Sequence, residues 1–306
     1  MTNGAMNAFY VDSRLQSANL ERMDKKLKIA HFTDPLCFWC YAMEPEMRKI
    51  RVLLGDQLDY SIVMGVLSAD AQELFGQGEA GELRYYYYRD MLAKYLGESA
   101  EWVGMPVSLE GLFSHGPEEL ISLPLSLAYC AMAMIDEDIA EAYLRRMREC
   151  VFAEGRSLAS VDAQVELAAE FPIDVEQFRS NLESDEVRSY LQGGVSLCRM
   201  YGVSAFPTLL MQYGSNGLLV SGYRDYETLR QAIAQVSEGD ISLSDAEFSI
   251  AAVEEYMGRF DKVAAREIQT MFSLNDAQLA NVMMDLATTG RYETQSCGNS
   301  YFVVTK

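Results

Sequence analysis

The chain has 306 residues, enough for one large elaborated domain or for two modest ones. Hydrophobic residues make up 49% of it and charged residues 23%, which is typical of a folded soluble protein and excludes a disordered, collagenous or low-complexity chain. The 45 acidic residues exceed the 25 basic ones and give a formal net charge of -20. This charge disfavours binding to nucleic acid or to an anionic membrane surface.

The amino-terminal segment, residues 1–27, is polar and carries charges of both signs. It has no apolar stretch long enough for an export signal, and no run of about 18 apolar residues occurs elsewhere in the chain. Six cysteines are too few for a disulfide-stapled secreted scaffold. We therefore expect a cytoplasmic protein without a membrane span.

The first predicted elements form a strand, a helix and a strand. Residues 28–33 read as a strand, which Asp34 and Pro35 close. A helix over 38–54 follows, because apolar residues recur there at helical spacing, and residues 58–66 supply a second apolar strand.

From about residue 69 to residue 201 the pattern is almost wholly helical. Helices are expected over residues 82–96, 123–135, 139–152, 160–171, 175–182 and 185–201. Strand character then returns in a hairpin, residues 206–212 and 218–221, and a closing helix spans 226–236. This order predicts an α/β domain, residues 28–68 and 202–237, interrupted by a helical insertion over residues 69–201.

The most specific motif is Cys37-Phe38-Trp39-Cys40, a C-x-x-C at the junction of the first strand and helix. A thiol at a helix amino terminus faces unpaired backbone N–H groups and the positive end of the helix dipole, which favour the thiolate. Cys37 is therefore the expected nucleophile. Cys40 lies one helical turn further on, where it can attack a mixed disulfide formed at Cys37 and act as the resolving thiol.

Three other interpretations of the cysteine pair remain open. A structural zinc site needs four ligands, and neither a second C-x-x-C nor a suitably spaced pair of histidines is present, since the only two are His31 and His115. Two buried structural cysteines could fall three residues apart by chance. A permanent structural disulfide would not persist in a reducing compartment. We expect no metal and no cofactor.

The residues between the cysteines are aromatic. Phe38 and Trp39 bring neither a positive charge nor a reliably aimed donor to the Cys37 sulfur, whereas Asp34 and Glu44 mildly disfavour an anion there. The two rings could form an apolar lip for exposed hydrophobic segments of a protein substrate. The alternative is that Trp39 packs against the helical insertion.

The segment Thr33 to Tyr41 resembles the active-site segment of the DsbA-like thioredoxin superfamily, in particular its cytoplasmic FrnE-like branch of disulfide isomerases. A second match, Tyr201 to Leu209, is similar to the family's cis-proline loop and has Pro207 in the proline position. The resemblance covers about residues 28–236. It implies a thioredoxin-like fold, with Cys37, Cys40 and Pro207 in the active site.

The resemblance also implies that the Pro207 peptide faces the cysteine pair and that its backbone pairs with the substrate chain. Proline fits the start of a strand because it lacks the N–H that a ladder uses, and an ordinary trans proline there is the alternative. We expect Phe38, Trp39 and Phe206 to contact the substrate. The chain differs from the family's oxidants in lacking a histidine between the cysteines, which favours a reductase, isomerase or peroxide-defence role.

Residues 246–306 form a separate carboxy-terminal module. Helices are expected over 248–259, 263–272 and 275–288, and strands over 292–296 and 301–305, an order that resembles a winged helix-turn-helix. The helix 275–288 has no lysine or arginine, and the module has eight acidic residues against five basic ones. These charges argue against DNA as the partner and favour a protein-interaction or self-association module.

The sequence thus predicts a cytoplasmic thiol-disulfide oxidoreductase of the reductase or isomerase type, with protein or peptide thiols and disulfides as substrates. The main alternative keeps the fold without the turnover: an adaptor that presents client proteins to a protease or regulator, like the bacterial Spx-adaptor relatives of this family. A redox-sensing transcription factor ranks third, because it needs affinity for DNA.

Overall fold

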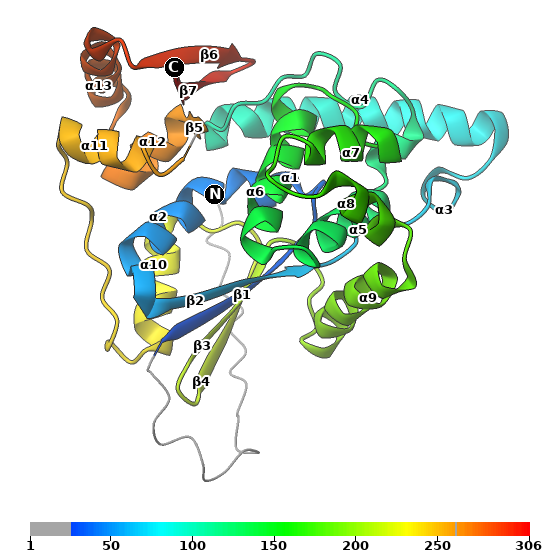
Figure 1. Cartoon of the computed structure of the whole chain (residues 1–306), viewed down its shortest axis with the longest axis horizontal. Helices are drawn as coiled ribbons and strands as arrows, with labels where there is room; N and C mark the ends of the chain where they lie inside the picture. Colours follow the sequence, from blue (N-terminus) through cyan, green and yellow to red (C-terminus); the bar gives the residue numbers. More distant parts are fainter. Residues whose placement is uncertain (1–25, 261) are drawn as a thin grey trace.

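The computed structural model describes residues 26–260 and 262–306, so the predicted polar segment, residues 1–27, lies almost wholly outside the described part. A central sheet carries helices on both faces, a block of helices lies beyond one end of the sheet, and a smaller unit ends the chain (Figure 1). The predicted fold class, an α/β thioredoxin-like fold with a helical insertion and a carboxy-terminal module, is confirmed.

The central sheet has four strands in the order β2-β1-β3-β4. The strands are β1 (Leu27–Thr33), β2 (Leu58–Met64), β3 (Thr208–Tyr213) and β4 (Asn216–Ser221). β1 pairs with β2 in parallel and with β3 antiparallel, so β3, which follows the helical insertion, lies beside the first strand of the chain. The insertion therefore leaves and re-enters one continuous sheet.

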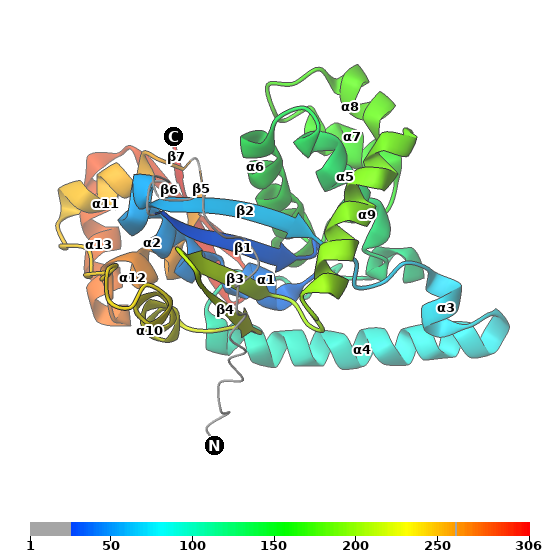
Figure 2. The same cartoon turned by 90° about the horizontal axis from the view of Figure 1, so that it is seen from below.

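Alternation along the strands gives the sheet two buried faces. On one face Leu27, Ile29 and Leu209 pack with helices α2 (Glu44–Leu54) and α10 (Tyr226–Val236). On the other face Phe32 and Leu210 pack with Cys198 of helix α9 (Asp185–Met200). The sheet is thus the middle of three layers, and its four strands lie side by side in Figure 2.

The first helix differs from its prediction. The expected continuous helix over 38–54 is two helices, α1 (Phe38–Ala42) and α2, that meet at Met43. Pro45 in the first turn of α2 explains the break, because proline has no N–H to continue the ladder of α1.

The helical insertion contains seven α-helices: α3 (Ala71–Phe75), α4 (Gly78–Val103), α5 (Leu123–Ala133), α6 (Glu137–Arg148), α7 (Val161–Ala168), α8 (Val175–Leu182) and α9. Helix α4 is longer than predicted at both ends and passes beneath the sheet next to α1 (Figure 2). Helix α6 starts earlier than predicted and continues into a π-helical turn, Glu149–Ala153. The limits that we assign to the insertion, residues 69–201, stay a prediction.

The carboxy-terminal unit consists of α11 (Ile250–Met257), β5 (Lys262–Ala264), α12 (Ala265–Phe272), α13 (Asp276–Thr289), β6 (Tyr292–Cys297) and β7 (Ser300–Thr305). Its three strands form a small sheet in the order β5-β7-β6. Strand β5 falls where the second helix was predicted to begin. The Glu267 side chain accepts the Ala264 N–H at 2.6 Å. This bond caps the amino terminus of α12, so the helix begins after Ala264.

This unit is joined to the rest of the protein by polar contacts, of which the contact of Arg145 with Glu267 is buried. Arg145 of α6 forms a two-pronged ion pair with Glu267 of α12, at 3.0 and 3.2 Å. Lys49 of α2 donates to Asp245 at 2.8 Å and to Ser273 at 3.1 Å. Because Arg145 and Glu267 are both buried, replacing either one by a neutral residue would leave the other as an unpaired charge in the protein interior.

The tip of the β6–β7 hairpin docks on the end of α4 through Asn299. Its side-chain amide accepts the N–H of Val107 at 2.8 Å and donates to the carbonyls of Ala100 and Met105 at 3.0 and 3.1 Å. A β-carbon at neighbouring Gly298 would clash with the Val107 carbonyl, so the two backbones come into direct contact there.

Replacing Asn299 by alanine should lower the free energy of unfolding by about 2 kcal/mol, because three backbone groups lose their partner. Chemical denaturation measures this loss. Gln295→Ala, which removes an exposed amide from the same hairpin, is the matched control. Equal stability of the two variants would show that Asn299 does not hold the hairpin in place.

Candidate functional site

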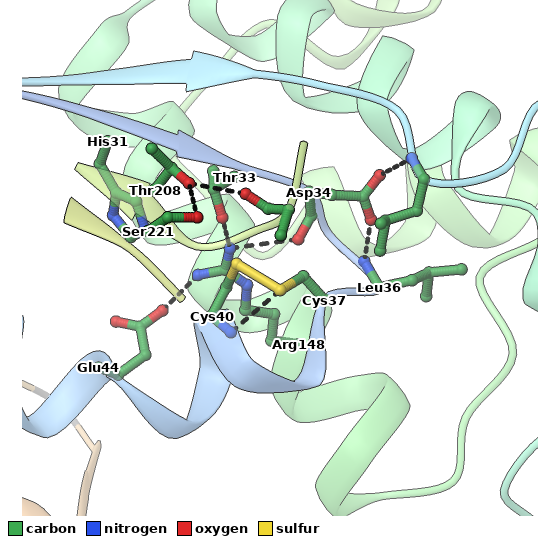
Figure 3. The surroundings of a disulfide bond; sticks show 12 residues. His31, Thr33, Asp34, Leu36, Cys37, Cys40, Glu44, Arg148, Thr208 and Ser221 are labelled. Carbon is green, nitrogen blue, oxygen red and sulfur yellow. Dashed lines mark hydrogen bonds and ion pairs between the residues drawn. A yellow bond between two sulfur atoms is a disulfide. The ribbon is translucent and has the colours of Figure 1, made fainter. Parts of the chain in front are cut away.

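The cysteine pair lies where the sequence predicts it, at the start of a helix. Cys37 is the N-cap of α1, and its sulfur accepts the backbone N–H of Cys40 at 3.1 Å. The two sulfurs form a disulfide, with Cα atoms 5.2 Å apart (Figure 3). The structure thus brings the two residues together in the oxidised form of a dithiol site.

The turn before Cys37 is fixed by Asp34, which is fully buried. One carboxylate oxygen accepts the N–H of Leu36 at 2.8 Å, the other accepts the N–H of Leu67 at 2.7 Å, and the Asp34 carbonyl accepts the Cys37 N–H. Burial raises the pKa of Asp34 to about 6, although these donors act in the opposite direction. Asp34 therefore ties the cysteine turn to the segment after β2.

Arg148, at the end of α6, is a site residue that the sequence analysis missed. It is 2% exposed and donates to the Glu44 carboxylate at 2.6 Å, to the Thr33 hydroxyl and to the Asp34 carbonyl. Figure 3 shows its guanidinium beside the disulfide. It places a positive charge where the local sequence predicted none. The only signal for it was the basic last turn of a helix more than 100 residues away.

The two cysteines differ in exposure. Cys37 is 5% exposed and Cys40 is 1% exposed, so Cys37 is the one with surface to offer a partner. The four other cysteines are unpaired, and burial raises the pKa of the Cys130, Cys150, Cys198 and Cys297 thiols. Only the C-x-x-C pair combines a helix start with a neighbouring cation.

The proline loop approaches the site from strand β3. The Phe206–Pro207 peptide bond is cis. Thr208 pairs with Phe32 in the antiparallel register, so Pro207 lies beside the end of β1, just before the cysteine turn. Thr208 and the neighbouring Ser221 appear next to this turn in Figure 3.

Phe38, the first of the two aromatic residues expected to form an apolar lip, is buried. It is 6% exposed and packs edge-on against Phe152, so most of its ring is buried. The first turn of α1 points this ring into the core, and the expected contact of Phe38 with a substrate stays a prediction.

Trp39 is half-buried and joins an aromatic cluster that the sequence did not reveal. Its indole N–H donates to the Tyr95 hydroxyl at 2.9 Å, and its ring contacts Tyr95, Trp102 and Tyr223. The alternative that Trp39 packs against the helical insertion therefore holds. The cluster is still accessible, because Trp102 is 65% exposed and Tyr95 is 46% exposed.

Phe206 is half-buried and packs over Gly65, the residue after β2. A β-carbon at Gly65 would clash with the outer atoms of the Phe206 ring, so glycine lets the ring pack in this position. Part of the Phe206 side chain remains at the surface beside Pro207.

Two further findings bear on the kind of site. Among residues 26–260 and 262–306, no group of three or more His, Cys, Asp or Glu side chains could hold a metal ion. Within the same residues, no helix combines the length and apolar character that crossing a membrane requires.

A thioredoxin family model matches residues 31–231, which is well over half of the chain, so this protein belongs to that family. Among solved structures, a protein disulfide isomerase candidate from Nitrosomonas europaea superposes with a TM-score of 0.58 at 18% identity, over 71% of this chain and 100% of that one. The cytosolic disulfide reductase DsbM from Pseudomonas aeruginosa superposes with a TM-score of 0.52 at 21% identity, over 70% and 93%. At these identities the two structures show a shared fold.

The curated relatives that match this chain are named as adapter proteins and not as disulfide enzymes. The ClpXP adapter protein SpxH of Bacillus subtilis is 24% identical over 268 residues, which is 86% of this chain and 84% of the relative. SpxH of Halalkalibacterium halodurans is 24% identical over 258 residues, with 83% and 80% covered. Since the family model spans only residues 31–231, these alignments extend beyond the thioredoxin-like part.

Glu46 of α2 contacts the aromatic cluster through Tyr223, and its buried carboxyl group makes the stability of the protein depend on pH. It is 2% exposed, one carboxylate oxygen accepts the Tyr223 hydroxyl at 3.2 Å, and the other has no partner. Burial raises the pKa of Glu46 from 4.5 to about 7. The folded protein therefore keeps this proton at pH values where the unfolded chain has lost it, and its free energy of unfolding falls as pH rises from about 4.5 to 7.

Glu46→Gln should remove this loss, because the amide stays neutral. At pH 8 the variant is expected to unfold with a free energy about 2 to 3 kcal/mol above that of the parent, and at pH 4 the difference should vanish. Denaturation at both pH values measures it, with exposed Glu227→Gln as the control. A variant no more stable than the parent at pH 8 would contradict the burial effect.

Proposed function

We propose that this protein is an adaptor that binds client proteins and presents them to a ClpXP-type protease. The main support for the proposal is the share of this chain that each group of similar proteins covers. The SpxH adaptors align with 86% and 83% of this chain, whereas the disulfide-enzyme structures superpose on about 70% of it. The similarity to the adaptors therefore extends over more of this chain than the thioredoxin-like fold alone would explain.

The position and the charge of the carboxy-terminal unit favour a protein as its partner. The ion pair of Arg145 with Glu267 and the contacts of Asn299 hold it against the helical insertion, so it is a fixed part of one surface. Helix α13 carries two aspartates and no cation, which disfavours DNA. We assign the client contact to the exposed part of the Trp39 and Trp102 cluster, with Phe206 as a further contact, and we place the protein in the cytoplasm.

The dithiol supports a second candidate function, protein disulfide reduction or isomerisation of the FrnE-like type. In that reaction the Cys37 thiolate attacks a substrate disulfide, forming a mixed disulfide and releasing one substrate thiolate, which takes up a proton. Cys40 then attacks Cys37, which releases the second thiol and leaves the pair oxidised. A dithiol or glutathione reductant must reduce the pair again. The N-cap position of Cys37 and the nearby Arg148 favour this candidate.

The adaptor proposal predicts that client and protease binding does not pass through sulfur. Tagged Cys37→Ser protein should retain client and ClpXP subunits as well as the parent in quantitative pull-downs, and it should support client degradation at the same rate. Cys297→Ser, which changes a cysteine outside the site, is the matched control. Loss of the client from Cys37→Ser alone would contradict the proposal.

The exchange candidate predicts the opposite dependence on sulfur. Cys40→Ser should accumulate a mixed disulfide with its partner through Cys37, visible as a band that disappears on reduction, and the parent should reduce insulin with glutathione as donor. Cys37→Ser should do neither. Absence of turnover by the parent, together with no trapped partner, would leave the dithiol without an enzymatic role.

A further inference from the structure

The outer face of helix α4 carries large apolar side chains. Its inner face holds Tyr85, Leu96 and Val103, which pack in the hydrophobic core. A surface helix normally carries polar and charged residues on the side opposite its buried face. In α4 that side instead carries a row of exposed apolar and aromatic residues, spaced by four or seven positions: Leu83, Tyr87, Met91, Tyr95 and Trp102. We call this row the α4 stripe.

The α4 stripe is accessible along its length. Leu83 is 71% exposed and Tyr87 is 72% exposed, and α4 lies along the lower edge of the structure in Figure 2. The rise per residue of an α-helix makes the stripe about 29 Å long, or about five turns. Tyr95 and Trp102, at its end, contact Trp39 beside the dithiol. The stripe is therefore continuous with the aromatic cluster to which we assign the client contact.

The charges of α4 favour a basic partner. The helix contains five acidic residues and three basic ones. All three cations have partners within the chain: Arg84 donates to the Phe75 carbonyl at 3.0 Å, Arg89 pairs with Asp90, and Lys94 lies 4.0 Å from Glu98. Within the described part of the chain, the other three acids of α4, Glu79, Glu82 and Glu101, form no ion pair. A partner with lysine or arginine beside its apolar residues is complementary to this surface.

The spacing of the stripe favours a helix as the occupant. Leu83, Tyr87, Met91 and Tyr95 are four residues apart and form a single ridge along α4. Another α-helix packs on such a ridge by placing its own side chains in the grooves on either side. A strand has no edge to pair with there, because the backbone groups of α4 are used within the helix. Tyrosine and methionine side chains also adapt to different apolar partners.

Charge disfavours a second copy of this protein as the occupant. Two α4 helices packed antiparallel would place the end with Glu79 and Glu82 opposite the end with Glu98 and Glu101. Parallel packing would place each of these acids beside its own copy. The formal net charge of -20 on each chain adds to this repulsion.

We propose that the α4 stripe binds a basic amphipathic α-helix of the client protein, which lies along α4 with its apolar side on the stripe and its lysines or arginines beside the acids. This inference deepens the adaptor proposal and rests on it, since it names the kind of segment by which a client is held. The end of the bound helix reaches the aromatic cluster around Trp39.

Three labelled peptides test the proposal by fluorescence anisotropy with the full-length protein. The first is about 20 residues long, the length of the stripe, with leucine at helical spacing and with lysine and alanine elsewhere. In the second, glutamate replaces lysine, and the third has the composition of the first with leucine at every second position. The first peptide should bind at least tenfold more tightly than either of the others. No binding of the first peptide, or equal binding of the first and third, would overturn the proposal.

Variants locate the bound peptide on the surface. Met91→Ser and Tyr87→Ser shorten exposed side chains of the stripe and should each weaken binding of the first peptide about tenfold. Met284→Ser is the matched control, because Met284 is also an exposed methionine on a helix, 61% against 51% for Met91, and lies on α13. It should bind the peptide as the parent does. Equal weakening by Met91→Ser and Met284→Ser would contradict the assignment to α4.

Two further measurements separate this inference from its alternatives. The parent should sediment as a monomer, and a dimer that Tyr87→Ser dissociates would overturn the proposal by showing that a second copy occupies the stripe. Peptide binding without client degradation by ClpXP would support the docking surface and contradict the adaptor function. Client degradation at the parent's rate in Tyr87→Ser and in Met91→Ser would support the adaptor function and overturn the docking surface.

Discussion

The buried guanidinium of Arg148 is the interaction on which the dithiol site depends. It comes from the helical insertion, yet it holds the end of β1 through Thr33 and Asp34 and the start of α2 through Glu44. These two points flank Cys37 and Cys40, so the geometry of the motif is set by a residue far away in sequence. Because a buried charge needs polar partners, the insertion and the thioredoxin-like sheet cannot adjust independently of each other.

The same logic extends to the carboxy-terminal unit. Arg145, one helical turn before Arg148, pairs with Glu267, and Asn299 caps the junction with α4. One helix of the insertion thus connects the C-x-x-C motif to the last part of the chain. This continuity suits an adaptor, which must offer its client and the protease one rigid surface.

Local signals in the sequence predicted the sheet, the helical insertion, the small carboxy-terminal sheet and the place of Cys37 at a helix start. The differences from the prediction have one local cause and several distant ones. The break at Met43 follows from Pro45, a local signal that the periodicity of apolar residues concealed. The burial of Phe38 and the approach of Arg148 depend on how the insertion packs, and one sequence has no periodicity that reports such contacts. The C-x-x-C motif located the site, but tertiary packing determined its electrostatics.

The most direct test of this account is the pH dependence of Cys37 alkylation in the reduced protein. The account predicts an apparent pKa below the ordinary thiol value of about 8.5 for the parent. In Arg148→Met this apparent pKa should rise by about one unit, and in Arg148→Lys, which keeps the charge, it should rise less, with the fold checked by circular dichroism. An apparent pKa that is the same in all three proteins would show that Arg148 does not control the dithiol site.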